Sequence, residues 1–458
     1  MELVQMGESA GLRMKGSLAY TLSISTVAAL GAVMFGFDIA IISGAVPFVQ
    51  QNFGLTELQL GWGVSSLIIG SMLGALAAGR AADRFGRKRT LLWIALVFAV
   101  SSVFTAIAPT FTTFFLARIL GGLAVGAASM ISPLYIAEVA PSQVRGGLVT
   151  LSQLGITVGC LVSYLINYLL RNIGPNNWRW MFATGALPSV AFFVLLFFVP
   201  ESPRWLFLAG KREKAREILA RVGGVENADR ELAAMHEVKD ERVGTLSDLL
   251  HPRYRRVLIV GALLAMLVQM SGINTVIAYS PIILRSVGNG LDTAFLQTFL
   301  IGLVNFLATF IAILCVDKFG RRPLYMIGST GMAISLLLLS VGYRTGHLSG
   351  WSGFVLVLVF IASFAGCIGP VYWILMAEMF PTKIRGMAMS AAVFLCWLFN
   401  FVVVLLFPWF MKNLGGSVTF LLLAVMSIAM FVVAWKLVPE TTGQTLEQIE
   451  EKWGIGLE

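Results

Sequence analysis

Charged residues are scarce in this sequence. Only 12% of the 458 residues are Asp, Glu, Lys or Arg, whereas 57% are hydrophobic. A water-soluble protein of this length would carry about twice that fraction of charge. Apolar runs of about 20 residues, each long enough to cross a bilayer as a helix, recur along almost the whole chain. The composition therefore excludes an ordinary soluble protein and predicts a protein that crosses a membrane many times.

Cysteine and histidine are also rare, with four and three copies. Each cysteine stands alone in a different apolar run, and the histidines are scattered among polar connections, so we expect neither a disulfide nor a metal site. No nucleophile–base pair stands out, and we therefore expect no enzyme and no bound cofactor. The net charge of +9 requires no nucleic-acid partner, since membrane topology already explains basic loops.

Twelve apolar runs are candidate membrane spans. They cover residues 19–46, 58–79, 90–109, 112–134, 148–170, 179–199, 257–284, 295–316, 323–343, 353–376, 386–410 and 418–438. Backbone groups find no water in a bilayer, and continuous rather than alternating apolar runs favour helices over strands. We predict an all-α membrane protein with twelve transmembrane helices.

The basic residues of the short loops predict the orientation. The loop after the second span contains Arg80, Arg84, Arg87, Lys88 and Arg89, whereas the loop after the first span has no Lys or Arg. Because basic loops stay on the cytoplasmic side, both termini are predicted to be cytoplasmic.

Three polar segments occur twice at a nearly constant offset. The segment GRAADRFGRKR (79–89) corresponds to VDKFGRRP (316–323), YIAEVAPSQVRG (135–146) to LMAEMFPTKIRG (375–386), and VPESPRWL (199–206) to VPETTGQTLEQIE (438–450). Two halves of equal orientation are typical of parallel repeats in transporters. We predict two six-helix bundles, 1–199 and 257–438, with a cytoplasmic helical linker, 200–256, and a cytoplasmic tail, 439–458.

The repeated segments carry acids and bases at the inner ends of the predicted helices. Taken alone, each is an ordinary solvated basic loop. Their repetition predicts a gate network whose members can pair across the two bundles and hold the cytoplasmic side shut. Its predicted members are Asp83, Arg87, Glu138, Arg145, Glu201, Asp317, Arg321, Glu378, Arg385 and Glu440.

Only two formal charges lie inside the predicted spans, Asp38 and Arg118. A charge at the bilayer centre costs roughly 2.5–3.5 kcal/mol, so such residues indicate a function or a partner. Both lie at similar depth in the outer half, which makes them plausible partners. One interpretation is a static structural ion pair. In the other, Arg118 controls whether Asp38 holds a proton, since burial favours the neutral acid and a nearby arginine favours the carboxylate.

Uncharged polar and aromatic side chains interrupt several other spans. Gly272, Pro281 and the Gly369-Pro370 pair are expected to weaken their helices, and broken helices are where transporters bind substrates. Amides and aromatic faces suit a neutral polyhydroxylated molecule, although polar contacts between helices would explain some of these residues equally well. The predicted substrate-binding residues are Gln153, Gln269, Asn274, Tyr279, Asn305, Trp373, Trp397 and Asn400.

Along essentially its whole length the chain resembles the sugar porter family of the major facilitator superfamily, in particular bacterial proton-coupled monosaccharide symporters. The motifs that carry the resemblance are GRAADRFGRKR, PESPRWL, QMSGIN, GPVYW and PETTGQTLEQIE, in this order. The resemblance implies the major facilitator fold, a proton-coupling role for Asp38 and Arg118, and an inner salt-bridge network. It also implies sugar contacts for Gln153, Gln269, Asn274, Asn305, Trp373 and Trp397.

Three positions depart from the family pattern. Val268 stands where the family has a glutamine, Ala278 where it has an aromatic residue, and Cys396 where an amide commonly precedes Trp397. These departures shift the expected substrate toward an unusual or partly deoxygenated sugar, or a polyol.

The sequence thus predicts a proton-coupled symporter that imports a hexose or pentose by alternating access. We expect a monomer in a cell membrane, the inner membrane of a bacterium, with the sugar, the proton and the bilayer as its partners. The alternatives are an uncoupled sugar facilitator, a polyol transporter and a sugar sensor that does not transport. The short predicted tails argue against the sensor.

Overall fold

The computed structural model describes residues 17–141, 144–237, 251–381, 383–442, 444 and 446–453. Within these residues every regular element is helical, and twelve segments are long and apolar enough to cross a membrane, as predicted. The first half contains α2 (Leu18–Phe53), α3 (Glu57–Phe85), α4 (Arg87–Ile107), α5 (Phe111–Val139), α6 (Arg145–Leu170), α7 (Asn177–Ala183) and α8 (Ala186–Leu196), of which α7 and α8 form one span.

The linker begins with three short helices, α9 (Pro203–Leu208), α10 (Arg212–Gly223) and α11 (Val225–Glu237). The second half contains η2 (Pro252–Tyr254), α13 (Arg255–Met270), α14 (Ile273–Ser286), α15 (Leu291–Phe319), α16 (Arg321–Thr345), α17 (Gly350–Ser363), η3 (Phe364–Ile368), α18 (Gly369–Met379), α19 (Arg385–Asn413), α20 (Gly415–Leu437) and α21 (Leu446–Lys452). The seventh span joins η2, α13 and α14, and the tenth joins α17, η3 and α18.

Several helices are longer than the predicted spans. The first covers Leu18–Phe53 and the second Glu57–Phe85, whereas the apolar runs end at 46 and 79. The extra turns are polar but good helix formers, such as RAADRF in α3. Hydropathy marks the part of a helix that fits the bilayer, whereas the backbone hydrogen bonds continue into the polar region.

Both spans that were expected to be broken, the seventh and the tenth, are interrupted. In the seventh span Gly272 adopts a left-handed conformation (φ 85°) and separates α13 from α14. An added Cβ at Gly272 would also press on the side chain of Leu423, so glycine suits this position for two reasons. Pro281 lies inside α14 without ending it. In the tenth span the five π-helical residues of η3 precede Gly369-Pro370, where α18 begins.

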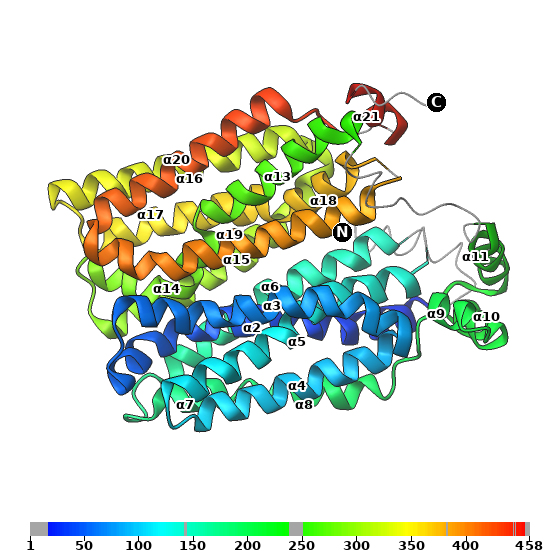
Figure 1. Ribbon diagram of the computed structural model, residues 1–458, viewed down its shortest axis with the longest axis horizontal. Helices are drawn as coiled ribbons and strands as arrows, with labels where there is room; N and C mark the ends of the chain where they lie inside the picture. Colours follow the sequence, from blue (N-terminus) through cyan, green and yellow to red (C-terminus); the bar gives the residue numbers. More distant parts are fainter. Residues whose placement is uncertain are drawn as a thin grey trace. The chain divides into compact units, whose positions relative to one another are not determined.

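The chain forms two compact units. The first contains the described residues of Met1–Asp38, Ile69–Gly159 and Phe182–Arg242, and the second those of Ile39–Ile68, Cys160–Met181 and Val243–Glu458. Within the first unit α4 packs against α5 and α8; within the second α16 packs against α20 and α13 against α19 (Figure 1). The two units do not follow the bundle boundaries at 199 and 257, and the division into two six-helix bundles stays a prediction.

Small residues allow α3 and α5 to approach closely inside the first unit. A Cβ added at Gly74 would collide with the backbone of Leu123, and one added at Gly126 would collide with the backbone of Ser71. Helices in membranes often associate through such glycine contacts, because they bring the two backbones together. This packing sets the position of α5, which carries Arg118.

Candidate functional site

Asp38 on α2 and Arg118 on α5 form a buried ion pair. The Arg118 guanidinium donates from Nη1 to Asp38 Oδ1, and its Nη2 lies 3.4 Å from the backbone oxygen of Asp38. Only 2% of the Arg118 side chain is exposed, compared with 10% of the Asp38 side chain. The structure therefore brings together the two charges that the sequence analysis singled out, and it leaves the acid more accessible than the base.

The surroundings of this pair are largely apolar. The centre of the Phe182 ring lies 5.2 Å from Arg118 Cζ, and Arg118 Nε is buried with no hydrogen-bond partner among the described residues. A Cβ added at Gly121, one turn beyond Arg118, would crowd the Ser101 hydroxyl and lie 3.3 Å from Asp38 Oδ2. Gly121 thus leaves room for the carboxylate. The described ion pair of Arg118 is with Asp38, and a buried charge that loses such a partner is left uncompensated.

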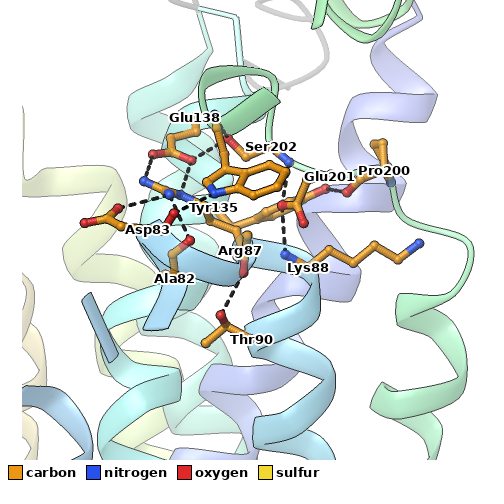
Figure 2. A network of polar contacts seen from close by, with 12 residues as sticks. Ala82, Asp83, Arg87, Lys88, Thr90, Tyr135, Glu138, Pro200, Glu201 and Ser202 are labelled. Atoms are coloured by element: carbon orange, nitrogen blue, oxygen red, sulfur yellow. Dashed lines mark hydrogen bonds and ion pairs between the residues drawn. The ribbon is translucent and has the colours of Figure 1, made fainter. Parts of the chain in front are cut away.

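A polar network lies where α3 meets α4 in the first unit, and Figure 2 shows it from close by. Arg87 donates from Nε to Glu138 Oε2 (2.8 Å) and from Nη2 to Glu138 Oε1 (2.9 Å), and its Nη1 lies 3.1 Å from Asp83 Oδ1. Ser202 donates to the same Glu138 carboxylate at 2.5 Å. Such a two-point contact holds the arginine in one orientation (Figure 2).

Glu201 acts as a helix cap within this network. Gly86 precedes α4 with φ 95° and offers no side chain of its own. The Lys88 backbone N–H donates instead to Glu201 Oε1 at 2.9 Å. A carboxylate at a helix N-terminus satisfies a free N–H and interacts favourably with the helix dipole.

The second half repeats this arrangement. Arg321 donates from Nη2 to Glu378 Oε1 (3.2 Å), and the Thr441 hydroxyl donates to Glu378 Oε2 (2.6 Å). Glu440 caps α16, because its oxygens accept the backbone N–H groups of Arg321 (3.0 Å) and Arg322 (3.1 Å). Each half therefore combines an arginine that begins a helix, a glutamate partner, and a glutamate–hydroxyl pair that follows the last span.

The remaining members of the predicted gate have other partners. Arg145 donates to the Ala140 carbonyl and, at 3.2 Å, to Glu231 on the linker helix α11. Arg385 donates to the Phe380 carbonyl, five residues before it, as Arg145 does in the first half. The Asp317 side chain lies outside the described residues.

The described ion pairs of Arg87, Arg145 and Arg321 each join groups of one unit. Pairing of the predicted gate residues across the two halves stays a prediction. Glu231 is not among the predicted gate residues, and only its place in the acidic linker segment could have indicated it.

Two of the predicted substrate residues meet at the break in the seventh span. The Asn274 amide donates to Gln269 Oε1 at 2.9 Å, across Ser271-Gly272. Both amides remain partly exposed. The break therefore allows two side chains from successive helices to present donors and acceptors at one place.

The structure gives Tyr279 a different setting. Its hydroxyl donates to the Val404 carbonyl at 3.1 Å, its ring stacks on Phe407, and only 1% of the residue is exposed. In this structure the hydroxyl holds α14 against α19, and a direct sugar contact of Tyr279 stays a prediction.

The other predicted substrate residues are spread over several helices. Asn305 lies on α15, Trp373 on α18, and Trp397 and Asn400 on α19, all in the second unit; Gln153 lies on α6 in the first unit. Asn305, Trp397 and Asn400 are buried, Gln153 is partly exposed and Trp373 is exposed.

The three departures from the family pattern are buried. Val268 and Ala278 are 3% and 4% exposed, and Cys396 lies 2.9 Å from the hydroxyl of Tyr372. Tyr372 is not among the predicted substrate residues, although it stands next to Trp373 in GPVYW. Its phenol places a polar group beside the thiol where an amide was expected.

Polar contacts in the second unit join the N-terminal repeat to the C-terminal repeat. Tyr164 on α6 donates to the Ile277 carbonyl at 3.0 Å. Arg171 pairs with Asp292 at 2.5 Å, and Lys412 pairs with Glu57 at 3.3 Å. These ion pairs were not predicted, because each of their residues belongs to a short, sparsely charged loop or helix end.

The comparisons with known proteins agree with this architecture. The family described as "Sugar (and other) transporter" matches residues 24–453. This chain belongs to that family. Among the described residues of this sugar transporter, no group of three or more His, Cys, Asp or Glu side chains could hold a metal ion. Membership agrees with the prediction of a transporter rather than an enzyme.

Two curated relatives illustrate the similarity. The arabinose-proton symporter of Bacillus subtilis (strain 168) is 38% identical over 444 residues, which cover 95% of this chain and 96% of the relative. The D-xylose-proton symporter of Escherichia coli (strain K12) is 37% identical over 473 residues, with 95% and 96% covered. The inward open structure of the E. coli xylose transporter XylE superimposes with a TM-score of 0.84 at 35% identity, covering 94% of this sugar transporter and all of that chain.

Proposed function

We propose that this protein is a proton-coupled symporter that imports a monosaccharide by alternating access. The observation that carries the proposal is the buried Asp38–Arg118 ion pair in a member of the sugar transporter family. Relatives that share more than a third of its residues over nearly their whole length are named as arabinose-proton and D-xylose-proton symporters.

The pair supplies a simple coupling device. When Asp38 accepts a proton, its negative charge disappears and Arg118 loses the group that compensates its own charge. The helices α2 and α5 are then free to separate, and sugar binds to the protonated form. When the proton leaves, the carboxylate pairs again with Arg118 and favours the return of the empty carrier. Because Asp38 is the more exposed partner, the proton reaches the acid without displacing the arginine first.

The proposed substrate is a neutral hexose or pentose. Gln269 and Asn274 offer uncharged donors and acceptors at the helix break, and Trp373 offers an exposed aromatic face. Amide groups hydrogen-bond hydroxyl groups, and an aromatic ring covers the C–H surface of a sugar. The relatives act on arabinose, xylose and glucose by their names, which makes these three sugars the first candidates.

Location and orientation follow from the same reasoning. The twelve spans make the chain a multi-pass membrane protein. We place it in the inner membrane of a bacterium as a monomer, with both termini in the cytoplasm, because its basic loops follow the even-numbered spans.

The test is uptake of labelled L-arabinose, D-xylose and D-glucose by proteoliposomes. With an acidic outside, one of these sugars should accumulate above its equilibrium level, and a protonophore should abolish the excess. Uptake that stops at equilibrium and ignores the pH gradient would make the protein a facilitator. Saturable binding without uptake would make it a sensor.

A further inference from the structure

A groove runs between α16 and α20 on the second unit. Its volume is about 730 Å³, and Met326, Ile327, Phe431 and Trp435 line its apolar length, with Arg322 and Glu440 at one end. Both helices are membrane spans. Ile327 is 60% exposed and Trp435 is 53% exposed, so the described part of the chain leaves this side of the helix pair largely uncovered.

Two cations flank the polar end of the groove. Arg322 donates from Nε to the Ala434 carbonyl (3.2 Å) and from Nη2 to the Trp435 carbonyl. These bonds give partners to two free backbone carbonyls in the last turn of α20. Its Nη1 has no hydrogen bond to any described residue. Lys436 is exposed, its Nζ lies 5.7 Å from the centre of the Trp435 ring, and no ion pair is present for it in the described part of the chain.

The acid at this end does not cancel these charges. Glu440 accepts hydrogen bonds from the backbone N–H groups of Arg321 and Arg322 and from the hydroxyl of Thr442. Burial raises the pKa of the Glu440 carboxyl. The hydrogen bonds from Thr442, Arg321 and Arg322 lower it, and their combined effect outweighs burial, so that the pKa lies below its usual value. The carboxylate is therefore charged, and its charge is directed at the N-terminus of α16.

The first half provides an internal comparison. Lys88 corresponds to Arg322 and donates to the Phe197 carbonyl at 3.0 Å, so capping the last span is common to both halves. Counting back from the shared Val-Pro-Glu, Phe197 corresponds to Lys436 and Leu196 to Trp435. The second half therefore adds a cation and an aromatic residue that the capping role does not require.

We propose that this groove binds an anionic phospholipid, with its phosphate on Arg322 and Lys436 and one acyl chain along Met326, Ile327 and Phe431. Basic sites at the ends of transmembrane helices bind anionic headgroups. Tryptophan prefers the level of the headgroups, which matches the place of Trp435 between the cations and the apolar length of the groove. The inference is independent of the transported substrate.

The test uses the full chain reconstituted in phosphatidylcholine vesicles. Brominated acyl chains quench the fluorescence of nearby tryptophans. The difference in quenching between the wild type and a Trp435→Phe variant is the contribution of Trp435 and reports on the groove. Brominated phosphatidylglycerol should quench this component in a saturable manner, and more strongly than brominated phosphatidylcholine at the same mole fraction.

The Lys436→Gln variant should weaken the preference for phosphatidylglycerol by about threefold or more. Arg89→Gln, at another exposed basic position, is the matched control and should leave it unchanged. Equal quenching by the two lipids, or an unchanged preference in Lys436→Gln, would overturn the proposal and leave only non-specific boundary lipid at the groove. Sugar uptake is not part of the readout, so failure here is separate from failure of the proposed transport function.

Discussion

Arg118 on α5 holds Asp38 on α2 in an ion pair whose base is more deeply buried than its acid. In the proposed coupling mechanism this asymmetry has a functional consequence. A proton arriving by water meets the carboxylate first, whereas the guanidinium has little access to solvent. Protonation of Asp38 therefore removes the compensation of a charge that cannot itself leave.

The first prediction concerns Asp38→Asn, which imitates the protonated acid permanently. Proteoliposomes with this variant should lose accumulation driven by a proton gradient, worth roughly fifty-fold at 100 mV, while exchange of labelled for unlabelled sugar continues. Asp229→Asn, at an exposed linker position, is the control and should accumulate sugar normally. Proton-driven accumulation by Asp38→Asn would contradict the coupling role.

The second prediction is a double-mutant cycle on the same pair. Asp38→Asn leaves the Arg118 charge buried without a partner, which should lower the free energy of unfolding by about 3–5 kcal/mol. Combining it with Arg118→Met removes that charge and should recover at least about 1 kcal/mol of the loss. Thermal unfolding in detergent measures the stability of the wild type, the two single variants and the double variant. Additive effects would show that the two side chains do not depend on each other.

The third prediction concerns the helix cap Glu440. Glu440→Gln should lower the free energy of unfolding by about 1 kcal/mol at pH 7, because a neutral amide compensates the N-terminus of α16 less well. The pKa of Glu440 in the folded state lies below its usual value of 4.5, so its stabilising effect is present above that value and disappears as the pH falls through the folded pKa.

The difference between wild type and Glu440→Gln in thermal unfolding should therefore shrink in acid. Glu451→Gln, on the exposed face of α21, is the control and should unfold like the wild type at both pH values. A difference that grows on acidification would refute the assigned role of the cap.

The fourth prediction concerns the Arg171–Asp292 pair. Asp292 is 68% exposed, and exposed pairs contribute only about 0–1 kcal/mol, so Asp292→Asn should raise the opening equilibrium of this contact by at most about fivefold. Hydrogen exchange of the backbone amides at 286–291 measures it. The effect should vanish in concentrated salt, which screens exposed charges. Arg344→Gln, at an exposed position, should exchange like the wild type.

The fifth prediction separates Gln269 from Tyr279. Gln269→Ala should weaken sugar binding about tenfold or more, since it removes a partly exposed amide at the helix break. Tyr279→Phe keeps the stacking on Phe407 and should lose only about 1 kcal/mol of stability, with the sugar affinity unchanged. Equilibrium binding of labelled sugar, together with thermal unfolding, distinguishes the two. Weakened binding in Tyr279→Phe would return this tyrosine to the substrate site.

The spans could be predicted because the bilayer demands about 20 apolar residues for each crossing helix, and few other patterns meet that demand. Their ends could not, since helices such as α2 and α3 continue into polar turns that hydropathy does not register. Asp38 and Arg118 could be singled out because a charge is conspicuous in an apolar run. Tyr372 and Asp292 could not be singled out, because their contacts with Cys396 and Arg171 depend on helices that are distant in sequence.

The sequence by itself determined the number of crossings, the repeated polar segments and the identity of two intramembrane charges, since each follows from local composition or spacing. Only the tertiary structure decided which groups meet. It gave Arg87 and Arg321 glutamate partners within their own halves, and it directed the Tyr279 hydroxyl to a backbone carbonyl. Hydrogen bonds and ion pairs act over about 3 Å, and the packing of helices distant in sequence sets which side chains come that close.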